Sequence, residues 1–475
     1  MWRSTPASVL AVGRSAALAR RALTLLLLRQ LLLTPPAAAG AGAVGGAGAA
    51  LARRAPLLAP PMTWMTWLQY QCAAPPRFNC TAADDVCINE RLLAGAAQTL
   101  AAEGYLAAGW NRVLLDDCGV AHARDPVTHA LPLDPLRFPS GLAGLAASVH
   151  ASGLQLGVYT SISYTTCTAR WHFPGSRGFE AVDAATWAAS GVNYVKADGC
   201  GDESYYTTGY ALMGAALDAQ APAITFSCSW PYYVGGNETG KNWSQFVAAG
   251  CTTGRSFTDV QCSWNNSVVA VIDHYGDAAA FFQQLARDTG FVVDADALLA
   301  GTRGGYAPPN QGDASQLCLT PDEERSQFAV YAILALPLQI SNNLSAVPAA
   351  TKAMLLNAEA IAVSQDGIVG GLRVSPKGMQ EVWARNLTAA GGGQVAVVLL
   401  NKGEAPANIT VFFADVSLPR TVTAIDIWGL TPPCQHEYYY TELVPPHGSA
   451  FARFVPAGAP GGERIVRRRA RGGVE

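Results

Sequence analysis

The chain has 475 residues, of which 50% are hydrophobic and 14% are charged, with a formal net charge of −3. This length accommodates a barrel of roughly 250 residues and a second domain, and the hydrophobic content excludes a disordered chain. Residues 1–54 hold seven arginines and no acidic residue, which leaves 25 basic and 35 acidic residues elsewhere, a net charge of −10. A chain so acidic should bind no nucleic acid.

The N-terminal residues 1–54 form a predicted targeting segment and low-complexity leader. Arg14, Arg20 and Arg21 precede an apolar stretch at 22–33 and then small residues, which is the order of a secretory signal peptide. Arg29 interrupts the apolar stretch, and this feature also fits an organellar transit peptide. No later apolar run reaches about 18 residues, so we expect no stable membrane insertion.

Residues 55–366 alternate between apolar runs and Ala-rich segments that are compatible with helices. The runs are 113–118, 154–160, 192–200 and 223–230, and the helical segments are 88–106, 141–152, 179–189 and 210–219. Nearly continuous apolar strands are typical of a parallel sheet that is covered on both faces. The alternation predicts an α/β fold, a (β/α)8 TIM barrel.

Polar residues stand at the ends of these runs. Asp116 and Asp117 are near the end of the first run, Tyr159 is near the end of the second, and Lys196 and Asp198 are near the end of the third. Side chains at i and i+2 of a strand share a face, so Lys196 and Asp198 should project together. They would do so from the strand end where barrel enzymes have their active sites. A surface Lys–Asp pair is the alternative, and the repetition at other strand ends argues against it.

A second domain is expected at residues 367–456. After a helical stretch at 351–363, short alternating runs are separated by Gly, Pro and Asn: 380–385, 395–401, 409–413, 422–428 and 449–455. This pattern predicts a C-terminal antiparallel β-sandwich. Residues 457–475 contain five arginines and form an expected basic, disordered tail, with a docking or sorting signal as the less favoured alternative.

Glycosylation sequons and cysteines indicate the compartment. Eleven cysteines favour an oxidising environment over a reduced cytosolic one. Seven Asn-X-Ser/Thr sequons favour the secretory route, which provides such an environment. We therefore expect a secreted, lysosomal or vacuolar protein. The sequons begin at Asn79, Asn237, Asn242, Asn265, Asn343, Asn386 and Asn408.

From about residue 60 to 456 the chain resembles the melibiase family of glycoside hydrolases, which contains α-galactosidases and α-N-acetylgalactosaminidases. The matching motifs occur in order and with similar spacing. They are Met62–Trp67, Leu115–Cys118, Asp134–Leu142, Leu156–Tyr159, Lys196–Cys200, Ser227–Pro231, Arg255–Asp259, Pro337–Asn342 and Ser364–Asp366.

The resemblance implies two catalytic carboxylates. Asp198 matches the nucleophile, which forms a covalent glycosyl-enzyme, and Asp259 matches the acid/base. A retaining pair stands about 5–5.5 Å apart, and negative neighbours are expected to hold the proton on Asp259. Without the resemblance, an aspartate that is ion-paired with Arg255 would be the preferred interpretation. The reaction implies no metal and no organic cofactor.

The resemblance also implies a carbohydrate partner, a terminal α-galactoside. Asp116, Asp117 and Lys196 match ligands of the sugar hydroxyls, and Arg255 matches a partner of the 2-position substituent. The full set of implied substrate-binding residues is Trp67, Asp116, Asp117, Tyr159, Lys196, Ser229, Tyr233, Arg255 and Asp296. Relatives are often homodimers, although nothing in the sequence shows an interface.

Four disulfides are implied by the resemblance: Cys72–Cys118, Cys80–Cys87, Cys167–Cys200 and Cys228–Cys251. Cys262, Cys318 and Cys434 have no family partner. A Cys262–Cys318 bridge is a further hypothesis, and an odd number of cysteines leaves at least one thiol free.

The chain departs from the family pattern at positions that affect specificity. Ser229 stands where α-galactosidases of the animal type have a glutamate, as in the N-acetylgalactosaminidases, but Tyr232 replaces the small residue that those enzymes have three positions later. Gly119 replaces a usual tryptophan and is expected to open one wall of the pocket, and 290–296 lacks the usual Trp, Asn and Pro.

Three hypotheses follow. The first is a retaining exo-α-galactosidase, and the second is an α-N-acetylgalactosaminidase or an enzyme that accepts both sugars. The third is a catalytically weak galactoside-binding protein, which the retained Asp198 and Asp259 argue against.

Overall fold

The computed structural model describes residues 57–72, 81–82, 87–168, 173–304, 316–457 and 459. The leader predicted at 1–54, nearly all of the tail predicted at 457–475, and both Asn79 and Cys80 lie outside these residues. No helix in the described ranges has the length and apolar character needed to cross a membrane.

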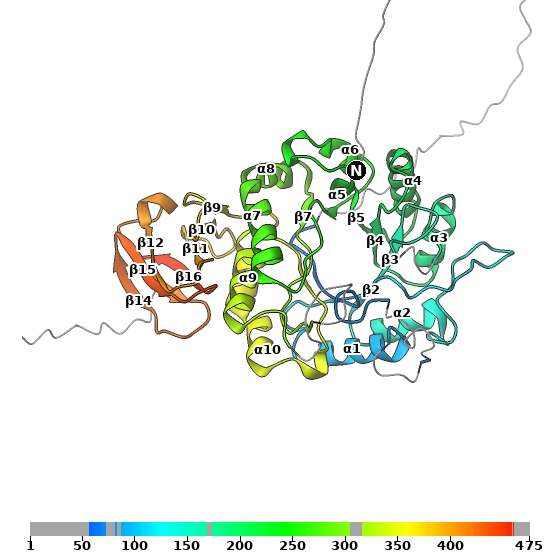
Figure 1. Cartoon of the computed structure of the whole chain (residues 1–475), viewed down its shortest axis with the longest axis horizontal. Coiled ribbons are helices and arrows are strands. Elements are labelled where there is room, and N and C mark those ends of the chain that lie inside the picture. The colour runs from blue at the N-terminus through cyan, green and yellow to red at the C-terminus, as the bar shows by residue number, and fades with distance from the viewer. Residues whose placement is uncertain are drawn as a thin grey trace, which may run out of the picture. The chain divides into compact units, whose positions relative to one another are not determined.

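Eight parallel strands form the barrel, in the order β7-β6-β5-β4-β3-β2-β1-β8 (Figure 1). An isolated bridge between Leu298 and Ile340 joins the segment after β7 to β8. The strands are β1 Met62–Met65, β2 Arg112–Leu115, β3 Gln155–Ser161, β4 Tyr194–Asp198, β5 Thr225–Cys228, β6 Thr253–Arg255, β7 Val292–Asp294 and β8 Leu338–Ile340.

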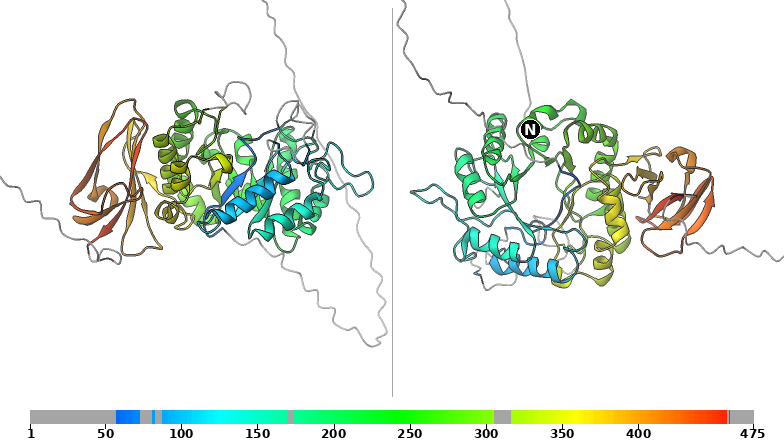
Figure 2. Two further views of the ribbon diagram at one scale, coloured as in Figure 1. Left: turned by 90° about the horizontal axis from the view of Figure 1, so that it is seen from below. Right: turned by 180° about the vertical axis from the view of Figure 1, so that it is seen from behind.

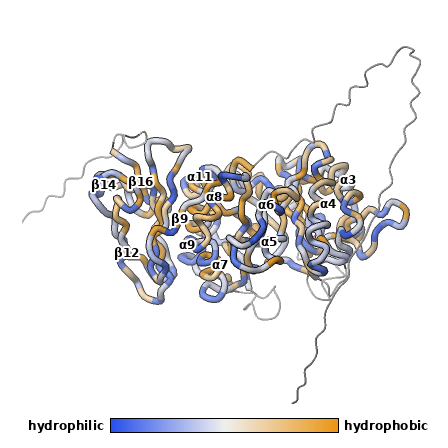
Figure 3. The backbone as a smooth tube through the Cα atoms, turned by 90° about the horizontal axis from the view of Figure 1, so that it is seen from above, coloured by the Kyte–Doolittle hydropathy of each residue, from blue (hydrophilic) through white to orange (hydrophobic). Residues whose placement is uncertain are grey.

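Helices surround these strands, as the view from behind also shows (Figure 2). The α-helices are α1 Glu90–Ala102, α2 Gly141–Ala151, α3 Glu180–Ala189, α4 Tyr206–Asp218, α5 Trp230–Tyr233, α6 Trp243–Ala248, α7 Val269–Asp277, α8 Ala279–Thr289, α9 Pro321–Ile333, α10 Ala349–Leu355 and α11 Ala358–Ser364. Hydrophobic and hydrophilic residues are mixed along the helices around the barrel (Figure 3), and α3 buries Glu180, Asp183, Ala184 and Trp187 at the spacing of one helix face.

Local signals explain where several helices begin and end. Asn89 caps α1, because its side chain accepts a hydrogen bond from the backbone N–H of Leu92 at 2.9 Å. α8 ends at Gly290, whose φ of 75° is the left-handed conformation that glycine tolerates. The single helical stretch predicted at 351–363 is wrong in one respect: Asn357 caps α11, so the segment forms two helices.

The C-terminal domain consists of two antiparallel sheets. One has the order β14-β13-β16-β11-β10-β9 and the other pairs β12 with β15, and apolar residues fill the space between them. The strands are β9 Leu372–Arg373, β10 Gln380–Asn386, β11 Val395–Asn401, β12 Ala407–Phe412, β13 Thr421–Asp426, β14 Cys434–Glu437, β15 Tyr439–Val444 and β16 Ser449–Pro456. The predicted barrel and antiparallel β domain are confirmed.

Arg385 ties the C-terminal domain to the barrel. This buried side chain on β10 donates hydrogen bonds to the carbonyl oxygens of Ala332 at 2.9 Å and Asp366 at 2.8 Å. Burial lowers the pKa of Arg385 to about 10. Backbone carbonyls near the ends of α9 and α11 therefore receive a fork of donors at the junction.

Candidate active site

Side chains from the carboxyl ends of six neighbouring strands, β1 to β6, line one pocket. The pocket encloses about 90 Å³, several times the roughly 10–15 Å³ that one water molecule requires. It is therefore large enough for a small polar ligand. The lining residues are Trp67, Asp116, Asp117, Tyr159, Cys167, Lys196, Asp198, Ser229, Tyr232, Tyr233, Arg255 and Asp259.

Lys196 on β4 and Asp116 at the end of β2 form a buried ion pair, with Nζ 2.8 Å from Oδ2. Burial alone would lower the pKa of Lys196, but the carboxylates of Asp116 and Asp198 raise it well above its usual value. Burial raises the pKa of Asp116, while Lys196 opposes that change. The pair presents a fixed donor and acceptor to the pocket.

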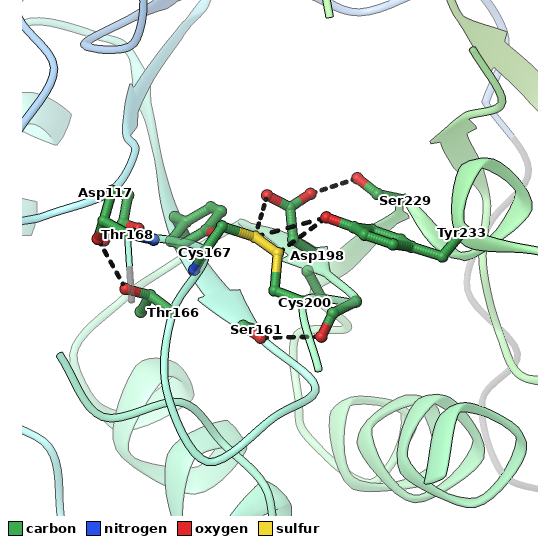
Figure 4. Close-up of a disulfide and its surroundings, with 12 residues drawn as sticks. Asp117, Ser161, Thr166, Cys167, Thr168, Asp198, Cys200, Ser229 and Tyr233 are labelled. Carbon is green, nitrogen blue, oxygen red and sulfur yellow. Dashed lines mark hydrogen bonds between the residues drawn. A yellow bond between two sulfur atoms is a disulfide. The ribbon is translucent and has the colours of Figure 1, made fainter. Parts of the chain in front are cut away.

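Asp117 lies beside this pair and is as buried as Asp116. Its Oδ2 accepts a hydrogen bond from Thr168 Oγ1 at 2.9 Å, and Thr166 is a second donor (Figure 4). Burial raises the pKa of Asp117 to about 7, although the two threonines pull it down. At acidic pH this carboxyl group is therefore protonated and can donate a hydrogen bond. Nothing in the sequence pattern pointed to Thr166 and Thr168.

Asp198 at the end of β4 is held by one hydrogen bond and borders a disulfide (Figure 4). Ser229 Oγ donates a 2.5 Å hydrogen bond to its Oδ1. Its Oδ2 lies 3.4 Å from the Cys167 sulfur, which is bonded to Cys200. A carboxylate fixed in this way has little freedom to turn, so one oxygen atom keeps a constant position at the pocket surface.

Tyr233 packs behind this carboxylate. Its ring leaves no room for a side chain at Gly199, where a Cβ atom would lie 2.5 Å from Cδ2 of the ring. Burial and the nearby charge of Asp198 raise the pKa of Tyr233 well above its usual value. Tyr232 lies in α5, is 39% exposed at the pocket rim and meets Tyr233 edge to face.

Arg255 at the end of β6 connects two carboxylates. Its Nη2 donates to Asp259 Oδ1 at 2.8 Å, and its Nη1 lies 3.2 Å from Asp296 Oδ2. The Arg255 guanidinium lowers the pKa of Asp259, whose side chain is 67% exposed. The expectation that negative neighbours raise this pKa is therefore wrong for the unliganded pocket, because the closest charge is a cation.

Asp296 is not placed as the sequence predicted. It is 4% exposed and does not line the pocket. Its Oδ2 accepts from the backbone N–H of Val260 at 2.8 Å, and it stands behind Arg255. Its position allows it to orient the guanidinium and the 259–260 backbone, without touching a ligand.

Gly119 borders extra space beside the pocket, as expected from the missing tryptophan. This space is a second, mainly apolar cavity and not an opening in the pocket wall, and it also borders Asp116, Asp117 and Tyr159. A Cβ atom at Gly119 would lie 2.6 Å from the Leu115 side chain. Leu115 therefore occupies part of the volume that a larger residue at 119 would need.

Disulfides brace the strand ends. Three of those implied by the resemblance are formed, namely Cys72–Cys118, Cys167–Cys200 and Cys228–Cys251. Cys262 and Cys318 form a fourth, which the sequence offered only as a hypothesis. Cys434 is an exposed free cysteine. The pairing of Cys87 with Cys80 lies outside the described residues.

Known proteins resemble this chain over most of its length. The family model described as alpha galactosidase A matches residues 59–366, and that of the alpha galactosidase C-terminal beta sandwich domain matches 377–454. Alpha-galactosidase A of Homo sapiens is 32% identical over 390 residues, or 81% of this chain and 82% of that protein. Alpha-N-acetylgalactosaminidase of Rattus norvegicus is 35% identical over 341 residues, or 70% and 75%. The crystal structure of alpha-galactosidase I from Mortierella vinacea superposes with a TM-score of 0.68 at 26% identity, covering 87% of this chain and 99% of that one.

Proposed function

Because this chain belongs to the melibiase family of glycoside hydrolases, we propose that it is a retaining exo-α-galactosidase. It would remove terminal α-D-galactosyl residues from oligosaccharides or glycoconjugates. The observation that carries this proposal is the presence of Asp198 and Asp259 in one pocket, together with the buried Lys196–Asp116 pair. A pocket closed at one end by charged groups suits the end of a sugar chain.

In the proposed mechanism, Asp198 attacks the anomeric carbon while Asp259 gives its proton to the glycosidic oxygen. The bond between C1 and that oxygen breaks, and the sugar becomes an ester of Asp198. Asp259 then removes a proton from water, whose oxygen attacks C1 and releases Asp198. Asp259 must be protonated for the first step, and Arg255 opposes this in the free protein. Turnover is therefore expected to favour acidic pH.

Sugar recognition would use the remaining residues of the pocket. Lys196 donates to hydroxyl oxygens, and Asp116 accepts from hydroxyl groups. Neutral Asp117 can donate and accept. Trp67 and Tyr159 would form apolar walls against the C–H face of the ring. These assignments place the 3-, 4- and 6-hydroxyls near β2 and β4, and the 2-position near β5 and β6.

An α-N-acetylgalactosaminidase is the second candidate. Ser229 is small, and its hydroxyl is engaged with Asp198 rather than directed at a 2-hydroxyl. This arrangement leaves room for a 2-acetamido group, whereas the neighbouring Tyr232 at the rim can reduce that room. The two residues act in opposite directions, so a substrate comparison is needed.

The secretory route is also part of the proposal. Four disulfides formed within the described residues support folding in an oxidising compartment, as do the sequons. The expected destination is the medium, a lysosome or a vacuole.

The deciding experiment uses the secreted full chain and its Asp198→Asn variant. Release of nitrophenol is measured from the α-galactoside and the α-N-acetylgalactosaminide across acidic pH. We expect the galactoside to be preferred and Asp198→Asn to be inactive with an unchanged melting temperature. A preference for the acetamido sugar would favour the second candidate. Binding of galactose without turnover of either substrate would overturn both in favour of a sugar-binding protein.

A further inference from the structure

The β12–β15 sheet of the C-terminal domain has an outer face that the proposed catalysis does not use. Its six side chains form three cross-strand pairs, Asn408–Leu443, Thr410–Thr441 and Phe412–Tyr439. We call this set the outer face. The alternate residues Ile409, Val411, Tyr440 and Val444 are buried in the domain core, so the alternation of a strand leaves the six on the other side.

Large apolar side chains are exposed on the outer face. Leu443 is 64% exposed, Phe412 is 54% exposed and Tyr439 is 51% exposed. The rings of Phe412 and Tyr439 meet at 6.1 Å, and the Thr410 and Thr441 hydroxyls lie 2.7 Å apart. Exposed apolar side chains gathered on one face can mark a surface that another group covers.

The same face carries a glycosylation sequon, Asn408-Ile409-Thr410. Asn408 is exposed, and in the described part of the chain no hydrogen bond holds its side-chain amide. Leu443 lies directly opposite Asn408, and the aromatic pair lies four residues along the strand, about 13 Å away at 3.3 Å per residue. A chain of sugars attached to Asn408 would start beside Leu443 and could reach the rings.

We propose that Asn408 carries an N-linked glycan whose first sugars lie over the outer face and cover its apolar side chains. The Asn408 Nδ2–C1 bond forms as the bond between C1 of N-acetylglucosamine and the diphosphate of its lipid carrier breaks. Nδ2 gives up one proton, and the lipid diphosphate leaves. Each sugar ring has an apolar C–H face, which packs against aromatic and aliphatic side chains, and a hydroxylated rim, which faces water.

Asn386 provides a matched contrast within the same domain. It begins the sequon Asn386-Leu387-Thr388 and is also exposed at the end of a strand. Its cross-strand partner Val395 is 3% exposed, so no apolar surface beside it needs cover. A glycan there would have no face to protect.

The first test is site occupancy in the full chain, secreted from a eukaryotic host. Peptide mass spectrometry after enzymatic glycan release in ¹⁸O-water should show Asn408 modified in most molecules. Unmodified Asn408 alongside glycosylated Asn237 or Asn343 would overturn the inference and leave the proposed secretory route intact. Absence of glycan from every sequon would overturn both. Glycosidase activity, measured on the same sample, tests the proposed function separately.

The second test concerns the covering of the outer face. Asn408→Gln should raise the fluorescence of a bound hydrophobic dye at least twofold, and Asn386→Gln should not. Adding Phe412→Ser to Asn408→Gln should bring the signal back toward that of the parent. An unchanged signal in Asn408→Gln would show that the glycan does not cover the face. A dimer in the fully glycosylated protein that Phe412→Ser dissociates would make a second copy the occupant and overturn the inference.

Discussion

Ser229 Oγ donates a 2.5 Å hydrogen bond to Oδ1 of Asp198, so the residue that follows β5 holds the carboxylate at the end of β4. A hydrogen bond to a charged group contributes about 1.5–3 kcal/mol, which corresponds to roughly ten- to hundredfold in a rate. Ser229 therefore contributes to the orientation of the proposed nucleophile.

The first prediction concerns this contact. Ser229→Ala should lower kcat for the galactoside about tenfold with little change in KM, because the attacking oxygen loses its orientation. Ser227→Ala is the matched control, since Ser227 lies on the same strand and contacts Tyr194 instead. Steady-state kinetics would measure both variants. Equal losses in the two would mean that β5 packing is responsible.

The second prediction concerns substrate choice. Tyr232→Ala should raise the ratio of kcat/KM for the N-acetylgalactosaminide over the galactoside about tenfold, because removal of a side chain that competes with an acetamido group is worth about 1–3 kcal/mol. Paired nitrophenyl substrates measure the ratio directly. Leu212→Ala, a change at an exposed residue outside the pocket, should leave it unchanged. A ratio that stays constant in Tyr232→Ala would show that the rim does not exclude the acetamido sugar.

The third prediction concerns pH and stability. The pKa of Asp117 rises from 3.8 to about 7 on folding, so the folded protein binds the proton more tightly than the unfolded chain. Asp117 therefore contributes stability that is fully present below about pH 4 and is lost as the pH rises through 7, by about 4 kcal/mol at most. Urea unfolding at pH 5 and pH 8 should show the loss, and Asp117→Asn should reduce it. A pH dependence that Asp117→Asn leaves unchanged would locate the loss in other groups.

The fourth prediction concerns the pH dependence of turnover. Arg255 lowers the pKa of Asp259, and the proposed acid must be protonated in the free protein. Arg255→Met should therefore move the alkaline limb of the kcat/KM profile to higher pH, whatever it does to the maximal rate. Asp296→Asn should move the limb to lower pH, because it removes a carboxylate that partly neutralises Arg255. Shifts in the same direction in both variants would contradict the assignment of Asp259 as the acid.

The fifth prediction concerns the buried ion pair. Lys196→Met leaves Asp116 buried without its cation, which should cost about 3–5 kcal/mol at neutral pH. Protonation of Asp116 relieves that cost, and burial already raises the pKa of this group. The loss should therefore be smaller at pH 5 than at pH 7.5 when unfolding is followed by circular dichroism. Lys352→Met, which removes an exposed pair with Glu103, should cost less than about 1 kcal/mol.

Regular patterns made the barrel and most of the C-terminal strands predictable. The spacing of hydrophobic residues in the apolar runs and in the sandwich strands can be read from neighbouring positions of the sequence. The carboxyl ends of parallel strands lie together at one end of a barrel. The strands β14 and β15 escaped prediction because only Tyr438, in the left-handed conformation with φ of 66°, separates them. No glycine, proline or asparagine marks that turn.

The sequence by itself determined the alternation of strands and helices, the residues at the strand ends and the cysteines available for bridges. Only the tertiary structure decided that Ser229 turns to Asp198, that Asp296 stands behind Arg255, and that Arg255 lowers the pKa of Asp259. The physical reason is that strand periodicity determines which face of the sheet a side chain takes. Its hydrogen-bond partners and the charges that shift its pKa belong to other strands, and only folding brings them to distances of about 3 Å.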